Sequence, residues 1–214
     1  MNKIFLLLII LTLAGCKKNH TEPVSGTSDS ITQTQNRSKS QSVEGNLSTK
    51  EDSLKKINDE ILQALKAKNY KRFAEFIHPE KGVRFSMYAF ISINEDKNFS
   101  KTDFIKYQPT KTVFIWGATD GSGEAHQATI NQYLRDWVFV KDFTESSYSL
   151  NHFQAGGNSL NNLKEIYPNT DFTENYIKAV GQNNEMDWNT LRFVFEEFKG
   201  KYYLVAVIND RWTI

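Results

Sequence analysis

The pattern of apolar and polar positions divides the chain into three stretches. Residues 4–13 form an apolar run that only Thr12 interrupts. Residues 17–49 are mostly polar, and twelve of these thirty-three positions hold Ser or Thr. Such a segment buries too little apolar surface to offset the entropy lost on ordering. From about residue 50 onward, apolar residues recur at helical or strand spacing. We therefore expect a leader over 1–15, a flexible, disordered linker over 16–49 and one globular domain over 50–214.

The globular domain is predicted to open with two helices. Ser48-Thr49-Lys50-Glu51 has the form of a capping box, which indicates a helix start near Ser48. The buried stripe of this helix would consist of Leu54, Ile57, Ile61, Leu62 and Leu65. A second short helix would bury Tyr70, Phe73, Phe76 and Ile77. It is predicted to end at His78-Pro79, because proline restricts the preceding residue and has no amide hydrogen to donate.

The remaining segments alternate between strand and helix patterns. Short helices are expected over 100–107, around Ile130–Trp137 and between Ser159 and Pro168. Strands are expected over 83–93, 112–116, 172–180, 188–198 and 202–209, with turns at 94–98, 120–124 and Lys199-Gly200. This order predicts an α+β fold in which a curved antiparallel sheet wraps around the N-terminal helices.

The leader has the features of a lipoprotein signal peptide. Lys3 precedes an apolar run whose ten residues, as a helix, would cross only about half of a bilayer core of roughly 30 Å. The run ends in Leu13-Ala14-Gly15-Cys16, which resembles the lipobox of bacterial lipoproteins. The resemblance implies cleavage before Cys16, acylation of its thiol with palmitate-like chains, and attachment to a membrane outside the cytoplasm. A secretory signal with an incidental cysteine is the alternative. In a cell with two membranes the outer one is favoured. An Asp directly after the Cys would resemble an inner-membrane retention signal, and this chain has Lys17 at that position.

Composition excludes several classes of protein. The 26 Lys and Arg residues nearly balance the 25 Asp and Glu residues, so the net charge of +1 lacks the footprint of a nucleic-acid binder. A single Cys excludes an internal disulfide framework and a metal site made of several thiolates.

Two segments of the domain resemble a known superfamily. Ala64–Tyr70 with Phe76–Phe85 resembles the opening of SnoaL-like, or nuclear-transport-factor-two-like, domains, and Trp188–Phe193 with Gly200–Val205 resembles their final hairpin. Residues 50–214 as a whole also resemble an uncharacterised group of bacterial lipoproteins that carry such a domain. The resemblance implies a cone-like sheet with a pocket at its wide end. It sets no function, because members of this superfamily include enzymes, binding modules and accessory domains.

Candidate functional residues follow from the chemistry that such a pocket would need. A pocket enzyme would use a base and an electrophilic partner separated in pKa by burial, and Asp136 and His152 are the candidate catalytic residues. The candidate pocket residues are Tyr88, Trp116, His126 and Trp188, and Asp187 is a further polar candidate. Each also has an ordinary structural explanation, because aromatic residues dominate small cores and His126 would suit a solvated helix start. His78 is expected at a helix end with its ring bonded to local backbone carbonyls.

No cofactor or metal site is predicted. Asp120 and Glu124 flank a loop that lacks the ligand alternation of a calcium site, and no His-Glu-x-x-His zinc helix occurs. Three function classes remain open. The first is a membrane-anchored binding module for a small ligand, a glycan or an envelope protein, and it is favoured because no acid and base pair stands out. The alternatives are a pocket enzyme that acts on a small envelope metabolite and a protective lipoprotein of the immunity type.

Overall fold

A computed structural model describes residues 38–180 and 186–213 of the chain. The predicted leader and the linker up to residue 37 lie outside these residues. The helices are α1 (Ser38–Lys66), α2 (Tyr70–Glu75), α3 (Lys101–Tyr107), α4 (Ile130–Tyr133), the π-helix η1 (Leu134–Val138), the 3₁₀-helix η2 (Phe143–Glu145) and α5 (Leu163–Ile166). The strands are β1 (Val83–Ser86), β2 (Lys97–Phe99), β3 (Val113–Ala118), β4 (Ala125–Thr129), β5 (Ser147–Leu150), β6 (Asp171–Ile177), β7 (Asn189–Phe198) and β8 (Lys201–Arg211).

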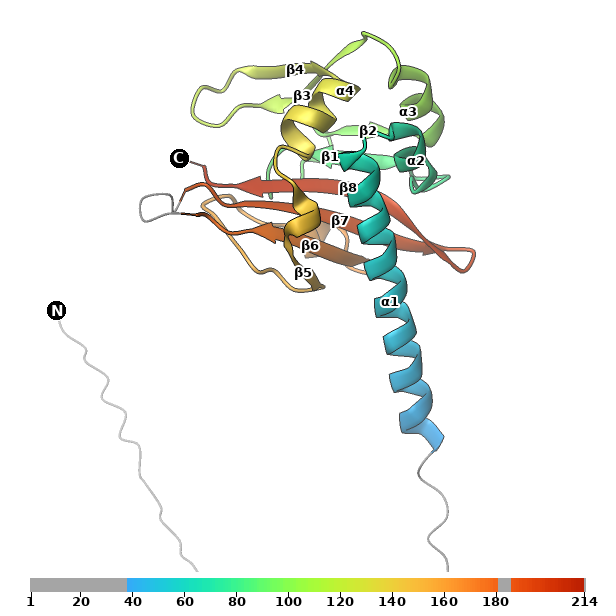
Figure 1. The fold of residues 1–214 in the computed structure, drawn as a ribbon. Helices are drawn as coiled ribbons and strands as arrows, with labels where there is room; N and C mark the ends of the chain where they lie inside the picture. Colours follow the sequence, from blue (N-terminus) through green and yellow to red (C-terminus); the bar gives the residue numbers. More distant parts are fainter. Residues whose placement is uncertain (1–37, 181–185, 214) are drawn as a thin grey trace, which may run out of the picture. The chain divides into compact units, whose positions relative to one another are not determined.

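Six strands form one curved, open sheet in the order β2-β1-β8-β7-β6-β5, and β3 pairs with β4 in a separate ribbon (Figure 1). Strands β5 to β8 and the β1–β2 pair are antiparallel, whereas β1 runs parallel to β8. The hairpin between β7 and β8 turns at Lys199 and Gly200, whose φ angles are 52° and 76°. Positive φ at both central residues is typical of a tight hairpin turn, as the sequence predicts. The α+β class with a curved sheet and helices is confirmed, but the expectation of an entirely antiparallel sheet is wrong at the β1–β8 pair.

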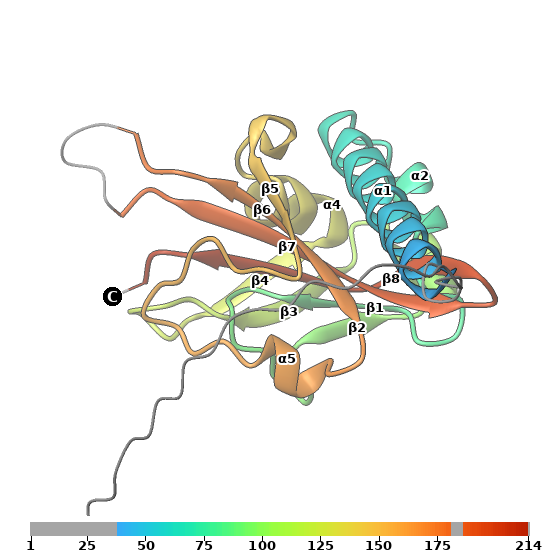
Figure 2. The same cartoon turned by 90° about the horizontal axis from the view of Figure 1, so that it is seen from below.

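Helix α1 crosses one face of the sheet and supplies the apolar stripe that the sequence predicts (Figure 2). Leu54, Ile61 and Leu65 are buried there. Asn58 lies within the same face, where its side chain bonds to Thr173 and Asn175 of β6 over 2.7 to 3.0 Å. The predicted start at Ser48 is wrong, because α1 begins at Ser38. The helical region therefore includes residues that the sequence pattern assigns to the linker.

The sheet separates two apolar cores because neighbouring residues of a strand point to opposite faces. Leu191, Phe193 and Phe195 of β7 belong to the larger core with α1, α2 and α3. Val194 of the same strand belongs to a smaller core with Leu163 of α5. Figure 2 shows α1 and α5 on opposite sides of the sheet.

The predicted strand over 83–93 is wrong beyond its first four residues. The Ser86 hydroxyl donates to the carbonyls of Tyr88 and Phe90, both over 2.9 Å, and so folds the chain back after β1. The expected turn over 94–98 is confirmed in its first part, where the amide of Asp96 donates to the carbonyl of Ser92, but residues 97 and 98 already belong to β2. Strands β4 and β5 lie in segments where the sequence predicts none. The expected helix after Ser159 is limited to α5, whose N-terminal residue is preceded by Asn162.

Gly82 allows the turn into β1 because its φ is +72°, a conformation that favours glycine. A Cβ atom at this position would lie 2.2 Å from the carbonyl oxygen of Phe99 on the neighbouring strand β2.

Across the described residues, no helix is both long and apolar enough to span a bilayer.

Candidate functional site

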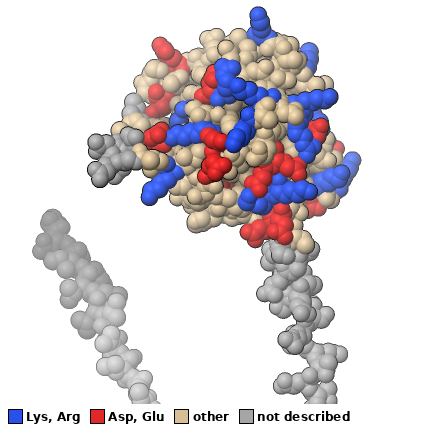
Figure 3. All heavy atoms as spheres, viewed as in Figure 1, with Lys and Arg blue, Asp and Glu red and all other residues tan. Residues whose placement is uncertain are grey.

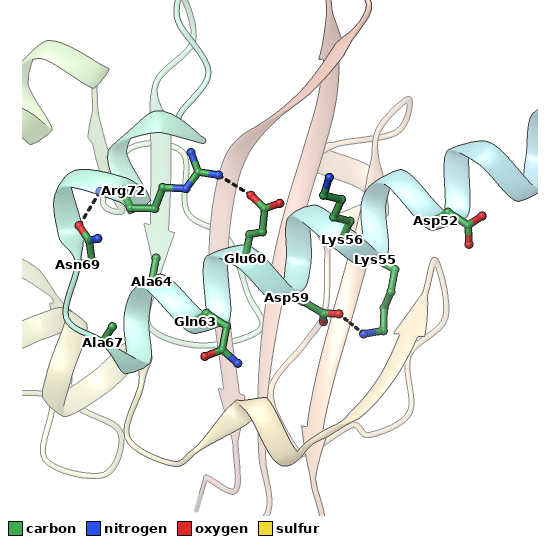
Figure 4. A pocket seen from close by; sticks show the side chains of 10 residues that line it. All are labelled: Asp52, Lys55, Lys56, Asp59, Glu60, Gln63, Ala64, Ala67, Asn69 and Arg72. Atoms are coloured by element: carbon green, nitrogen blue, oxygen red, sulfur yellow. Dashed lines mark hydrogen bonds and ion pairs between the residues drawn. The ribbon is translucent and has the colours of Figure 1, made fainter.

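One hollow of about 640 Å³ lies along the outer face of α1 and the start of α2 (Figure 4). Four of its charged residues form two pairs: Lys55 pairs with Asp59 over 2.5 Å, and Arg72 pairs with Glu60 over 2.5 Å. The face of the molecule in Figure 3 likewise shows acidic and basic side chains interspersed. Exposed pairs of this kind are worth only about 0–1 kcal/mol. Buried polar groups elsewhere in the domain are therefore stronger candidates for a site.

A second group of polar side chains surrounds Trp137, and we call it the Trp137 cluster. Its members come from four separate segments: Tyr88 after β1, His126 of β4, Tyr133 and Trp137 of the continuous helix α4–η1, and Arg211 of β8. The Arg211 guanidinium carbon lies 3.6 Å from the centroid of the Trp137 ring. The ring centroids of His126 and Tyr88 lie 4.9 Å and 5.7 Å from it. The fold thus brings one cation and three polar aromatic residues to a single indole.

Local structure places Trp137 at this point. Thr129 caps α4 in a capping box with Gln132, with contacts of 2.9 and 3.2 Å. The helix then widens into the π-helix η1, a rare form that is frequent at functional sites. The Trp137 indole nitrogen donates to the carbonyl of Met87 over 3.0 Å, which fixes the orientation of the ring.

Three polar atoms of the Trp137 cluster are buried and have no hydrogen-bond partner: Nε2 of His126, the hydroxyl of Tyr133 and Nη2 of Arg211. Leaving a buried donor or acceptor unpaired costs about 1–3 kcal/mol. Native proteins rarely leave such groups unpaired without a structural or functional reason. The presence of three around one ring makes the Trp137 cluster the strongest candidate site in the described part of the chain.

The electrostatics of the Trp137 cluster are dominated by Arg211. Burial raises the pKa of Tyr133 well above its ordinary value, so its hydroxyl keeps its proton. Burial, and then the positive charge of Arg211, lower the pKa of His126, so this ring is neutral at pH 7. Burial also lowers the pKa of Arg211, but an arginine remains charged in proteins. The cluster therefore has one positive charge and several hydrogen-bonding groups.

Three of the four candidate pocket residues lie in or beside the Trp137 cluster. Tyr88 and His126 are members, and Trp116 stacks on Tyr133 with a centroid distance of 3.7 Å. The Trp116 indole is fully buried and donates to the carbonyl of Ala128 over 2.9 Å, so it is a wall and not a binding group. Trp188 is buried elsewhere, against Gly157 in the loop after β5.

The candidate catalytic residues are not brought together. Asp136 is exposed and pairs with its neighbour Arg135 over 2.6 Å. It acts on the Trp137 cluster only through its charge, which opposes the lowering of the pKa of His126. His152 is exposed, and its backbone carbonyl accepts a bond from Ser149. Asp187 is likewise exposed and pairs with Lys141 over 2.8 Å. Asp136 and His152, both among the described residues, therefore do not form an acid and base pair.

Two further expectations are decided by the contacts. His78 does not bond to backbone carbonyls: its Nδ1 accepts from the amides of Glu80 and Lys81 over 3.2 and 3.0 Å. Residues 120–124 form the expected loop, which the bond from Thr119 N to Glu124 O closes over 2.8 Å. The amide of Asp120 donates to the Tyr88 hydroxyl over 2.9 Å, so this loop contacts the Trp137 cluster. Within the described ranges no group of His, Cys, Asp and Glu is arranged to hold a metal ion.

Sequence reasoning missed Tyr133, Trp137 and Arg211 as site residues. Tyr133 and Trp137 fit the buried side of a helix, and the spacing of apolar residues does not indicate what their polar atoms contact. Arg211 lies beyond residue 209, where the predicted last strand ends. Its position at the end of β8, opposite Asn189 of β7, becomes visible only in the register of the sheet.

Asp96 is the acidic group that acts on Tyr133, and burial raises its own pKa from 3.8 to about 6. Because the pKa of Asp96 is higher in the folded state, the protonated carboxyl contributes stability below about pH 4. This contribution is lost as the pH rises through about 6 and the group loses its proton. We expect Asp96→Asn to match the wild type near pH 4 and to be more stable by about 1–2 kcal/mol at pH 7.5, allowing for solvent screening. Urea unfolding at both pH values measures this. A difference that does not change with pH would contradict it.

No protein-family model matches the chain, and no curated protein sequence matches it. The interpretation of the Trp137 cluster therefore rests on its own contacts.

Proposed function

We propose that this protein is a membrane-anchored bacterial envelope lipoprotein whose globular domain binds a ligand at the Trp137 cluster. The lipobox-like sequence ending in Cys16 supports the anchor. The three unpaired polar atoms around Trp137 support the binding site, and they are the observation that carries the proposal. We also propose that the globular domain is SnoaL-like with a cone-like pocket. The sequence segments that resemble this superfamily support that assignment.

Binding is favoured over catalysis by the arrangement of the side chains. Asp136 and His152 are both exposed, and neither makes a hydrogen bond or ion pair with a member of the Trp137 cluster. The members of the cluster supply a fixed cation, a protonated hydroxyl and aromatic walls. A few polar groups among apolar walls are typical of a ligand-binding site.

Tyr133→Phe separates a binding role from a structural one. The variant keeps the ring stacked on Trp116 but removes a buried hydroxyl without a partner, so the ligand-free protein should become more stable by about 1 kcal/mol. We expect the same variant to lose small molecules that remain bound when the full chain is purified from cell envelopes. Mass spectrometry of extracts from the two proteins measures this loss.

Tyr148→Phe is the matched control, because the Tyr148 hydroxyl is also buried without a partner but lies in β5, outside the Trp137 cluster. It should gain stability and keep the same extract as the wild type. Extracts that are identical for wild type and Tyr133→Phe, or a Tyr133→Phe protein that is clearly less stable, would count against the proposed site.

A further inference from the structure

Arg211 differs from the other arginines set into the described part of the domain. Arg192 contacts two carboxylates, those of Glu174 and Asp210. Arg84 donates to backbone carbonyls, including that of Ile93 over 3.0 Å. Arg211 is half-buried and makes no ion pair with any described residue, and its Nη2 atom has no acceptor. A guanidinium that is partly removed from water without an opposite charge is destabilising, so this position requires an explanation.

The contact with Trp137 compensates only part of that cost. A cation over an indole face gains about 2 kcal/mol when it is desolvated. Such a contact uses the face of the guanidinium and leaves its N–H groups, which lie in its plane, free to donate. The Nη2 atom thus stays a buried donor that the aromatic ring does not satisfy.

Neither of the two acidic groups whose charge bears on His126 or Tyr133 pairs with Arg211. The charge of Asp96 raises the pKa of Tyr133, but the Asp96 side chain accepts a hydrogen bond from the amide of Ser92 over 3.0 Å. The charge of Asp136 raises the pKa of His126, but the Asp136 side chain accepts a hydrogen bond from Arg135. Tyr88 and Tyr133 are the groups whose charge bears on Arg211 itself, and both are neutral when protonated. The Trp137 cluster thus presents one positive charge beside a protonated hydroxyl.

We infer that the ligand of the Trp137 cluster is a small organic anion, a carboxylate in particular, which accepts hydrogen bonds from Arg211 Nη2 and the Tyr133 hydroxyl. This inference rests on the proposed function. Guanidinium groups match the geometry of carboxylates and of phosphates through paired N–H donors. The aromatic residues Tyr88 and Trp137 favour an organic body on the anion, because their rings lie next to the charge of Arg211.

The test is a titration of the full chain, solubilised in detergent, with three probes: benzoate, its neutral analogue benzyl alcohol, and inorganic phosphate. The readout is the ¹⁵N–¹H signal of the Trp137 indole, assigned by its absence in Trp137→Phe. We expect saturable shifts with benzoate, at least tenfold weaker binding of benzyl alcohol, and at least tenfold weaker benzoate binding in Arg211→Gln. Saturable binding of phosphate as well would extend the ligand class from carboxylates to small anions and would support the same assignment.

Arg135→Gln is the matched control, because it removes the same charge from an exposed arginine outside the Trp137 cluster. It should leave benzoate affinity unchanged, and thermal melting checks that both variants fold. Benzyl alcohol binding as tightly as benzoate, or benzoate affinity unaffected by Arg211→Gln, would overturn the anion inference while the proposed binding function stands. No shift with any probe, together with no small molecule in the extracts, would overturn both.

Discussion

Replacing Arg192 with Met is expected to lower the free energy of unfolding by about 3–5 kcal/mol at pH 7.5. Arg192 lies in the middle of the sheet, where its Nε donates to Glu174 over 2.5 Å and its Nη2 donates to Asp210 over 3.0 Å. The three side chains are 0%, 0% and 2% exposed for Arg192, Glu174 and Asp210. Without the guanidinium, two buried carboxylates would face each other with no positive charge between them. Urea unfolding followed by circular dichroism measures the loss.

The pH dependence distinguishes this cause from lost packing. Burial raises the pKa of Asp210 even beside Arg192, and removing the cation raises it further. Stability from a group with a raised pKa is present below its unfolded pKa, near 4, and is lost as the pH rises through the folded value. The deficit of Arg192→Met should therefore shrink as the pH falls toward 4.

Two control variants make the interpretation specific. Adding Glu174→Gln and Asp210→Asn to Arg192→Met should recover part of the lost stability, because the buried negative charges are gone. Arg135→Met, which breaks an exposed pair with Asp136, should change stability little. A deficit that is the same at both pH values and unaffected by the added substitutions would show that packing, and not charge, explains the loss.

Cys16→Ser is expected to abolish attachment of fatty acid to the protein. Cys16 is the only thiol of the chain, and the proposed anchor requires that thiol. Burial of an acyl chain contributes about 0.8 kcal/mol per methylene, so several chains hold a protein to a bilayer without a spanning helix. We expect labelled palmitate to appear in the wild type and to be absent from Cys16→Ser, which should also retain residues 1–15.

Lys17→Ser is the matched control for the anchor, because it changes the next residue without removing the thiol. It should be labelled like the wild type and should begin at Cys16 in N-terminal mass analysis. A natural protein with an unmodified Cys16 thiol, or equal labelling of Cys16→Ser, would remove the basis for placing the protein on a membrane.

Much of the fold could be predicted from the sequence because its strongest elements are periodic. Leu54, Ile61 and Leu65 identify the buried side of α1. The turn at Lys199-Gly200 sets the register of β7 against β8 as far as Phe195, beyond which a bulge shifts it. The short elements could not be predicted in the same way. β1 ends where the hydroxyl of Ser86 bonds to two later carbonyls, a local interaction that apolar alternation does not reveal.

The candidate site was predictable only in part, because it depends on contacts between distant segments. Tyr88 and His126 could be selected as candidate pocket residues by the chemistry of their side chains, but nothing in the sequence joins them to Arg211. The buried charges were invisible for the same reason. Glu174, Arg192 and Asp210 each occupy one strand, and only the antiparallel register of β6, β7 and β8 brings them together.

A crystal structure of the full mature chain, purified in detergent from the cells that produce it, measures most directly whether the Trp137 cluster is a ligand site. We predict electron density for a non-protein molecule within hydrogen-bonding distance of both Arg211 Nη2 and the Tyr133 hydroxyl. Density in which these two atoms bond only to water, or to side chains of the chain itself, would contradict the assignment.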